Sequence, residues 1–385
     1  MGYNFDRFVG RIAAIRPASG LFDDQTVEVE VQDWMGYTAT QELGIIARDV
    51  NKRADQAITT ALENAPIQPV RTDFDTGVET FLTIFDTDTP TTSLANFLQK
   101  MARNEWGRVY LKADGTLRFE NQTHRGGVSA LSFELDGLMS EFDVEYDVNA
   151  LANVVRIRVS LATIDAASIL LWSLAGAPPI LPGQTLALNC PYTDVNGNQA
   201  KISAIDVEDP PFFEFGSVQN FTSDDMHGDL VVVMVIGANS TNVYLTNVHA
   251  ATTGYLNDLQ VEGKGIHFAS PLIIERRDEE SIWSGIGERP LTVNLEQITD
   301  LDTAAARAEA LLAVFSNPER LPVHLSFVAN QSAVLADASM DLEVSRRFTL
   351  AETMTGADGD YFINRVRYIL DSTELLVDIL ASPVD

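Results

Sequence analysis

Apolar and polar positions alternate with two different periods in the first third of the chain. Within residues 92–106, after a Thr92 or Ser93 that can begin a helix, four apolar side chains recur at helical spacing: Leu94, Phe97, Leu98 and Met101. The residues that follow alternate on both arms of a hairpin, and Asp114-Gly115 stands between the arms, where a tight turn favours positive φ. The pattern therefore predicts a short amphipathic helix followed directly by a β-hairpin.

Shorter patterns around this unit predict further strands and helices. Residues 7–15 and 25–34 indicate two strands, and the second has valines on one side and glutamates on the other, which we expect to face water. One apolar stripe predicts a helix before Pro66 and comprises Ala54, Ala57, Ile58, Ala61 and Leu62. A second stripe predicts a helix in the last third and comprises Ala304, Ala308, Leu311, Leu312 and Phe315.

The helical period is lost between residues 131 and 270, where short β-rich runs alternate with Gly, Asn and Pro. This spacing of strands and turns predicts a β-sandwich over 131–270. Residues 271–385 return to a mixed pattern, in which Arg365 and Arg367 alternate with apolar residues and are expected on a solvated strand face. The chain is thus expected to divide into 1–130, 131–270 and 271–385, with a β-rich α+β fold.

The charge balance excludes one large class of functions. The 385 residues include 26 basic and 55 acidic side chains, a formal charge of -29 at pH 7. Proteins that grip nucleic acids neutralise phosphates with Lys and Arg, so this chain is expected to repel DNA and RNA. Residues 131–270 are especially acidic, with 4 basic against 17 acidic side chains. Simple solubility accounts equally well for such a charge.

Sequence signatures of catalysis are absent from the chain. No zinc-protease, nucleophile-elbow, phosphate-loop or dinucleotide-binding motif occurs. The single cysteine, Cys190, has no histidine near it in sequence and is expected to be a small core residue. No apolar run is long enough to span a bilayer, and from the first residues we expect no export signal.

Acidic clusters offer the remaining candidates for chemistry. Paired carboxylates such as Asp86 and Asp88 are the residue type that glycoside hydrolysis needs, although 55 acidic residues produce such pairs by chance. The densest set of possible metal ligands is His227 with Asp224, Asp225 and Asp229. We expect solvated loops at these positions, and therefore no enzyme activity, no metal and no cofactor.

The order of elements in the first third resembles the central hub proteins of bacteriophage tail tips and baseplates. These have relatives in gene transfer agents and contractile injection systems. The resemblance lies in a strand pair carrying Gly10 in "FVGRI", a second strand closing on Asp33, and a helix followed by the helix and hairpin described above. In that last segment, Gly107, Asp114 and Gly115 hold the turns.

A second motif of this resemblance lies in the last third of the chain. The segment "RDEESIWSGIGERPLTVN" is similar to the family pattern of an Asp, a Ser-Ile pair and a glycine before a returning strand. Here the positions are taken by Asp278, Ser281, Ile282, Gly287 and Leu291. The family usually has an aromatic residue just before the glycine, where this chain has Ile286.

The resemblance implies a structural protein of the virion. Such a hub is a homotrimer whose two barrel-like domains per chain form a pseudo-sixfold ring, and the 131–270 sandwich would be an insertion. Its implied partners are tail-tube (distal tail) proteins, the tape-measure protein and central tip or fibre proteins. It would be assembled in the host cytoplasm into the tail tip, and DNA would pass through the ring without specific binding. A negative lumen would keep that DNA from adhering.

Two other functions remain open at this level. A receptor-binding or cell-wall glycan-binding or glycan-degrading tail protein would use the 131–270 region, with exposed aromatic side chains near paired carboxylates. Its candidate aromatics are Trp172, Phe212, Phe213 and Phe215. A soluble β-rich protein with no role in a tail is the third possibility.

Overall fold

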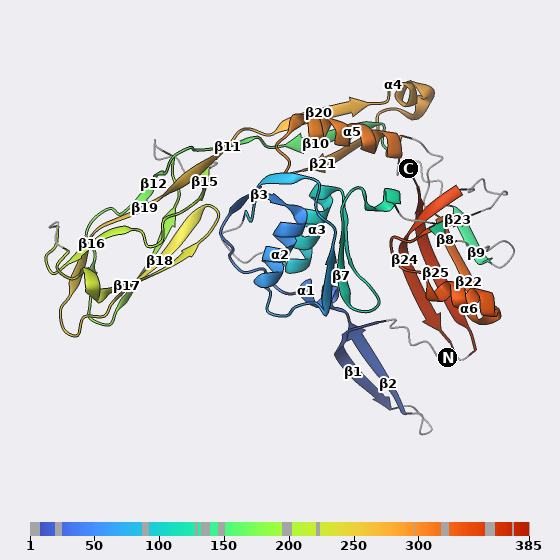
Figure 1. The fold of residues 1–385 in the computed structure, drawn as a ribbon, viewed down its shortest axis with the longest axis horizontal. Helices are drawn as coiled ribbons and strands as arrows, with labels where there is room; N and C mark the ends of the chain where they lie inside the picture. Colours follow the sequence, from blue (N-terminus) through green and yellow to red (C-terminus); the bar gives the residue numbers. More distant parts are fainter. Residues whose placement is uncertain are drawn as a thin grey trace.

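The computed structural model describes residues 8–19, 25–86, 92–127, 130–131, 139–144, 151–194, 202–220, 224–295, 297–316, 323–350, 359–371 and 373–384. Strands outnumber helices along the chain, which confirms a β-rich α+β fold. Figure 1 shows the N-terminal helical domain at the centre, with residues from the middle of the chain on one side and the C-terminal sheet on the other.

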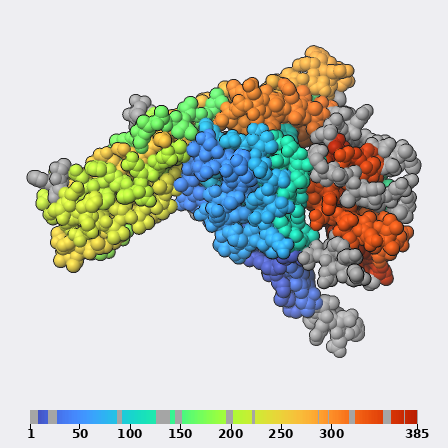
Figure 2. Space-filling model, in the orientation of Figure 1, coloured from blue at the N-terminus to red at the C-terminus, as the bar shows by residue number. Residues whose placement is uncertain are grey.

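An isolated hairpin begins the described chain. Strands β1 (Arg11–Ser19) and β2 (Gln25–Gln32) pair only with each other, and they extend from the body of the molecule as an arm (Figures 1 and 2). Three cross-strand pairs of apolar side chains share one face of the hairpin: Ile12 with Val31, Ile15 with Val29, and Pro17 with Val27. The polar face carries Arg16, which pairs with Glu28 and Glu30.

The N-terminal domain packs three helices against short strands. The helices are α1 (Trp34–Thr38), α2 (Ala54–Glu63) and α3 (Leu94–Glu105). A two-stranded sheet comprises β3 (Asp49–Arg53) and β5 (Thr80–Ile84). A three-stranded sheet comprises β4 (Arg71–Phe74), β7 (Thr116–Glu120) and β6 (Arg108–Leu111), followed by a 3₁₀ turn, η1 (His124–Gly127).

The predicted apolar stripes form the core of this domain. All five stripe residues of α2 and all four of α3 are buried, together with Leu117 and Phe119 of β7. Helix α3 begins as expected, because the Oγ atom of Ser93 accepts a hydrogen bond from the backbone N–H of Asn96 at 3.2 Å. Residues 112–115 connect the two strands, and among them only Gly115 has positive φ (81°). The sequence pattern therefore predicted this unit correctly.

The middle of the chain forms two sheets, and one long strand organises the first of them. Strand β19 (Gly254–Phe268) pairs with five others: β11 (Ala162–Ile164), β12 (Ile169–Ser173), β13 (Pro179–Ile180), β15 (Ile202–Ile205) and β16 (Phe212–Gly216). The second sheet comprises β14 (Thr185–Pro191), β18 (Ser240–Asn247) and β17 (Leu230–Ile236), which follows the 3₁₀ turn η2 (His227–Asp229). One apolar cluster draws residues from both sheets, including Phe215, Leu256, Val243 and Leu245.

A small central sheet follows with one helix. Its order is β20 (Leu272–Arg277), β10 (Val154–Val159) and β21 (Pro290–Asn294), and α5 (Leu301–Phe315) packs on it. Between β20 and β21 the chain forms two short helical segments, α4 (Glu279–Ser281) and η3 (Ile282–Ile286). Four of the predicted stripe residues of α5 are buried or half-buried, but Phe315 is exposed, so that position was predicted wrongly.

The C-terminal sheet curls into a half-barrel whose ends stay apart. Its order is β8 (Ala130–Leu131), β23 (Arg347–Leu350), β24 (Gly359–Leu370), β25 (Leu375–Pro383), β22 (Val323–Val328) and β9 (Met139–Val144). The segments η4 (Ala329–Gln331) and α6 (Ala333–Met340) follow β22. Strand β9 lies within the region expected to form the separate domain 131–270, yet it pairs with β22.

Substitution of Gly107 tests the packing of the helix–hairpin unit. Gly107 follows Trp106, which ends α3 in the left-handed conformation, and a Cβ atom at Gly107 would lie 2.1 Å from the carbonyl oxygen of Glu120. We expect Gly107→Ala to lower the free energy of unfolding by about 2–3 kcal/mol, because backbone atoms on both sides must separate. Urea unfolding followed by circular dichroism measures this change.

Gly44→Ala is the matched control, since no atom lies within 4 Å of a Cβ built at Gly44. This variant should stay within about 0.5 kcal/mol of the wild type. Equal stability of the two alanine variants would contradict the close approach at Gly107.

Candidate functional site

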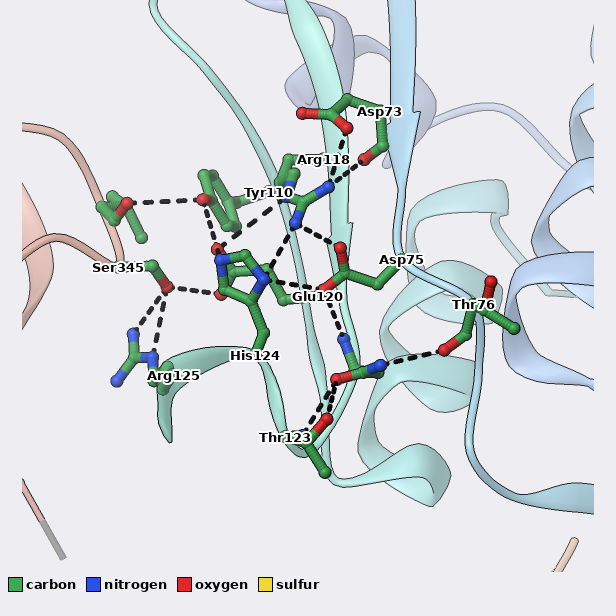
Figure 3. Close-up of polar contacts among 12 residues, drawn as sticks. Asp73, Asp75, Thr76, Tyr110, Arg118, Glu120, Thr123, His124, Arg125 and Ser345 are labelled. Atoms are coloured by element: carbon green, nitrogen blue, oxygen red, sulfur yellow. Dashed lines mark hydrogen bonds and ion pairs between the residues drawn. The ribbon is translucent and has the colours of Figure 1, made fainter. Parts of the chain in front are cut away.

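Strand β7 carries a cluster of charged side chains on the side opposite its apolar residues (Figure 3). The side chain of Arg118 is 8% exposed, and its Nη1 and Nη2 atoms donate to Asp73 Oδ1 at 2.8 Å and to Asp75 Oδ1 at 2.5 Å. His124 Nδ1 lies 2.9 Å from the second oxygen of Asp75. Hydrogen bonding from Lys112, with the nearby charge of Arg118, holds the pKa of Asp73 below its ordinary value. Asp73 is therefore held in its charged form, and the side chains of the cluster pair with one another.

Glu120, at the end of β7, links the N-terminal domain to the C-terminal sheet. Its side chain is 2% exposed and accepts hydrogen bonds from Tyr110 Oη at 2.7 Å and Ser345 Oγ at 2.5 Å. Tyr110 also donates to the carbonyl oxygen of Val344 at 3.3 Å. Burial of the Tyr110 hydroxyl, next to the charge of Glu120, raises the Tyr110 pKa. Residues more than 200 positions apart are thus joined by buried polar contacts.

A second buried junction joins the N-terminal domain to α5. Arg307 Nη2 donates to Glu79 Oε1 at 3.1 Å and to the carbonyl oxygen of Glu105 at 3.3 Å. The Glu105 side chain is fully buried and accepts the backbone N–H groups of Val78 and Glu79 at 2.6 and 3.1 Å. Burial raises the pKa of Glu105 despite these hydrogen bonds. The charge of Arg307 opposes this rise, since it attracts the Glu105 carboxylate as well as pairing with Glu79.

The motif residues of the last third surround one buried asparagine. Asn153 Nδ2 donates to the carbonyl oxygen of Gly287 at 2.8 Å and to Ser281 Oγ at 3.3 Å, and its Oδ1 accepts from the backbone N–H of Arg289 at 2.7 Å. Asp278 caps the short helix, accepting from the backbone N–H of Ser281 at 3.1 Å. Gly287 has a φ of 75°, which explains a glycine there. The structure therefore brings Asp278, Ser281 and Gly287 together.

The motif residues of the first third occupy separate turns. Gly10 lies against the end of β2, where a Cβ would come within 2.6 Å of the Gln32 carbonyl oxygen. Asp33 caps α1 by accepting from the backbone N–H of Gly36 at 2.7 Å. Asp114 accepts from the backbone N–H of Thr116 at 2.9 Å in the hairpin turn. Together with Gly107 and Gly115, these residues shape the backbone and form no common site.

The side chains considered above for catalysis or metal binding do not gather in one site within the described residues, and Cys190 packs in the core. No group of three metal-ligating side chains occurs within the described residues. The His227 ring stacks on Phe213 at 4.3 Å between centroids. Cys190 is buried, which raises its pKa to about 12. Asp86 pairs with Lys100 at 2.7 Å, whereas Asp88 lies outside the described residues.

The aromatic side chains considered for glycan binding do not form a shared platform. Phe213 and Phe215 are buried in the core between the two middle sheets, and Trp172 packs partly against that core. Phe212 alone among these four is exposed, at 52%. The alternating burial of a strand places consecutive side chains on opposite faces, so the run of phenylalanines in β16 is divided between core and solvent.

In two sheets, a helix covers the apolar face and the opposite face is polar. In the central sheet, Val155, Ile157 and Ile274 share a core with α5, while Arg156 on the other face pairs with Glu275 at 2.7 Å. In the C-terminal sheet, Leu325 and Phe327 pack with Leu335 of α6 in one apolar cluster. The opposite face of that sheet carries the exposed Arg365 and Arg367, as expected. Both units therefore share one design, a sheet covered by a helix on its apolar side only.

The hairpin of β1 and β2 lacks such a cover. Its apolar face remains open to solvent, with exposed fractions of 60% for Ile12, 58% for Ile15 and 58% for Val27. Val29 and Val31 on the same face are also exposed. The expectation that the glutamate face meets water holds, and the valine face meets water as well in the single chain.

Sequence reasoning missed the buried charged residues of both junctions. Arg118 and Glu120 alternate with Leu117 and Phe119, a pattern that normally places charges in solvent. Arg307 stands on the border of the apolar stripe of α5, where the small alanines around it were the only sign of close packing.

Among the helices that the structure describes, none combines the length and the apolar character of a membrane span.

Replacement of Arg307 tests the junction at α5. Arg307→Met leaves the buried Glu105 and its neighbour Glu79 without their cation, and we expect a loss of about 3–5 kcal/mol in the free energy of unfolding at pH 7. Because burial raises the pKa of Glu105, its ionised carboxylate destabilises the folded chain at pH values above that raised pKa. Protonation of Glu105 removes this destabilisation as the pH falls through that value. The deficit relative to wild type should therefore shrink as the pH is lowered.

Arg276→Met provides the comparison, since Arg276 pairs at 2.9 Å with Glu309 on the surface. An exposed pair contributes about 0–1 kcal/mol, so this variant should be nearly as stable as the wild type. Chemical unfolding at several pH values measures both variants. A pH-independent deficit for Arg307→Met would contradict the role given to Glu105.

Comparison with known proteins connects this fold to phage tails. No family model and no curated protein matches the sequence. The 43 kDa tail protein of prophage MuSo2 from Shewanella oneidensis has a similar structure, with a TM-score of 0.52 and 11% identity, covering 98% of this chain and 80% of that one. The tail protein from Neisseria meningitidis MC58 is similar with a TM-score of 0.52 and 10% identity, at the same coverage. The chain therefore shares its fold with proteins of phage and prophage tails.

Proposed function

We propose that this chain is a structural protein of a phage tail and forms the trimeric hub of its tip or baseplate. The observation that carries the proposal is the similarity of fold to two tail proteins over 98% of the chain. The motifs in both the first and the last third point to the same class of hub. The proposal assigns the chain no reaction, because an assembly protein works through complementary surfaces.

Two units of similar design in one chain support a ring. The central sheet with α5 and the C-terminal sheet with α6 each have one covered apolar face and one polar face. Three copies supply six such units, which matches a hexameric tail tube on one side and a threefold tip on the other. Neighbouring copies then close the open sheets into the barrel-like domains of the ring.

The exposed face of the hairpin supports contact between copies. A two-stranded hairpin is marginally stable alone in water, and a contiguous exposed apolar face marks a contact surface. In the proposed ring a neighbouring copy covers Ile12, Ile15 and Val29, while the paired charges of the other face remain in water. The hairpin is thus the arm through which one copy holds the next.

The proposed ring surrounds the path of the DNA. Arg156 and Arg277 on the polar face of the central sheet are both engaged by Glu275, at 2.7 and 3.2 Å, so they offer few free cations to phosphates. DNA passes without specific binding in this arrangement. The ring joins tail-tube proteins, the tape-measure protein and central tip or fibre proteins, and it enters the virion during assembly in the host cytoplasm.

Light scattering after size-exclusion chromatography, with electron microscopy of the same fraction, tests the proposal. We expect a particle of about three times the 42.2 kDa chain mass with threefold symmetry. A chain that stays monomeric at high concentration, also when mixed with purified tail tubes, would contradict the hub.

The contact made by the hairpin has its own test. The double variant Ile15→Lys and Val29→Lys places two charges on the apolar face, and we expect it to fold as a monomer, with trimer formation weakened at least tenfold. Size-exclusion chromatography measures the assembly, and circular dichroism measures the fold.

Glu28→Gln is the matched change on the polar face and should leave the trimer intact, since exposed ion pairs contribute little. If the double-lysine variant assembled as well as Glu28→Gln, the hairpin would lie outside the contact.

A further inference from the structure

Two arginines meet at the seam between the N-terminal domain and the C-terminal sheet. Arg108 at the start of β6 donates from Nη1 to Asn364 Oδ1 at 2.8 Å. Arg125 in η1 donates from Nη1 and Nη2 to the same oxygen, each at 3.3 Å. Two guanidinium groups therefore converge on one neutral amide oxygen of β24.

The second arginine is fixed by its surroundings. Arg125 also donates to Ser345 Oγ from Nε at 3.2 Å and from Nη2 at 3.0 Å (Figure 3). Its guanidinium lies over the ring of Phe362, 4.7 Å from the centroid. A charge held by a hydroxyl and an aromatic ring is preorganised without being neutralised.

Neither arginine has a carboxylate partner in the part of the chain that the structure describes. The charge of Glu120 attracts both arginines, although its two oxygens accept their hydrogen bonds from Tyr110 and Ser345. Burial, with repulsion from Arg108, lowers the pKa of Arg125 to about 10. In a chain with 55 acidic and 26 basic residues, a single carboxylate, that of Glu120, thus offsets two guanidinium groups at this seam. Two guanidinium groups beside one carboxylate leave an excess of positive charge at the site, which a small anion can neutralise.

A cavity lies directly beside the two guanidinium groups. It has a volume of about 290 Å³, and its lining includes Arg108, Arg125, Asn121, Gln122 and Phe362, with Glu120 as its one acidic residue. Arg108 remains exposed, which gives an ion a path from solvent. The two arginines of the N-terminal domain and residues of β24 and β25 thus surround one space.

We propose that this cavity binds a small oxyanion, a phosphate or a carboxylate, held by Arg108 and Arg125. The planar fork of a guanidinium fits the oxygens of either group, and two forks from adjacent elements can share one ion. The ion neutralises the seam and ties β6 and η1 more firmly to β24. This site is separate from the hairpin and the sheet faces on which the proposed assembly depends.

Isothermal titration calorimetry of the full-length protein tests the site, with inorganic phosphate in one titration and acetate in another, at ionic strength matched with chloride. We expect one saturable site per chain for at least one of these ions, and the stronger ligand identifies the source of the oxyanion. Absence of saturable binding in both titrations would overturn the proposal.

Variants then locate the site. Arg108→Gln and Arg125→Gln should each weaken binding at least tenfold, since each removes one of the two cations. Arg103→Gln changes an exposed arginine on α3 and should bind as the wild type does. Binding that is equal in all three variants would place the ion elsewhere and overturn the proposal.

Asn364→Asp provides a test that does not weaken the seam. The new carboxylate would stand where both guanidinium groups already point, so we expect the melting temperature without added ion to rise by about 2–4 °C. The oxyanion should no longer bind to this variant. Wild-type affinity for the ion in Asn364→Asp would count against the site.

Discussion

The structure depends on one strand that is buried on both faces. All five residues of β7 are buried, and their side chains alternate between two environments. Leu117 and Phe119 complete the core of the helical domain, while Arg118 and Glu120 face a network of paired charges. A strand in this position cannot shift by one residue, because charges would enter the apolar core and apolar side chains would enter the ionic network. The register of the hairpin therefore fixes how the N-terminal domain meets the C-terminal sheet.

Buried polar contacts connect the parts of the chain. Each part has its own apolar cluster, and the junctions between them are made by Glu120 with Ser345 and by Arg307 with Glu79. Buried ion pairs contribute little net stability compared with apolar contacts, but they tolerate only one geometry. Such junctions suit a protein that must present several surfaces at set angles to its neighbours. In the proposed hub, these angles determine whether three copies close into a ring.

The hairpin and the junctions represent two opposite uses of amphipathic strands. In β1 and β2 the apolar face is left open, which is unfavourable for a single chain and favourable for an assembly. In β7 both faces are satisfied within the chain. The junction arginines, in turn, are matched with carboxylates inside the chain. The arginine pair at Asn364 departs from this matching.

Local patterns in the sequence determined the helix–hairpin unit, the apolar stripes of α2 and α3, and the β-rich character of the middle region, since spacing and turn residues act over a few positions. Tertiary structure alone decided that β9 joins β22, that Asn153 gathers Asp278, Ser281 and Gly287, and that Arg118, Glu120 and Arg307 are buried. A charged residue in an alternating strand faces water unless a distant segment covers it, and nothing near it in sequence records that cover. Contacts between residues more than 100 positions apart therefore had to be seen in the folded chain.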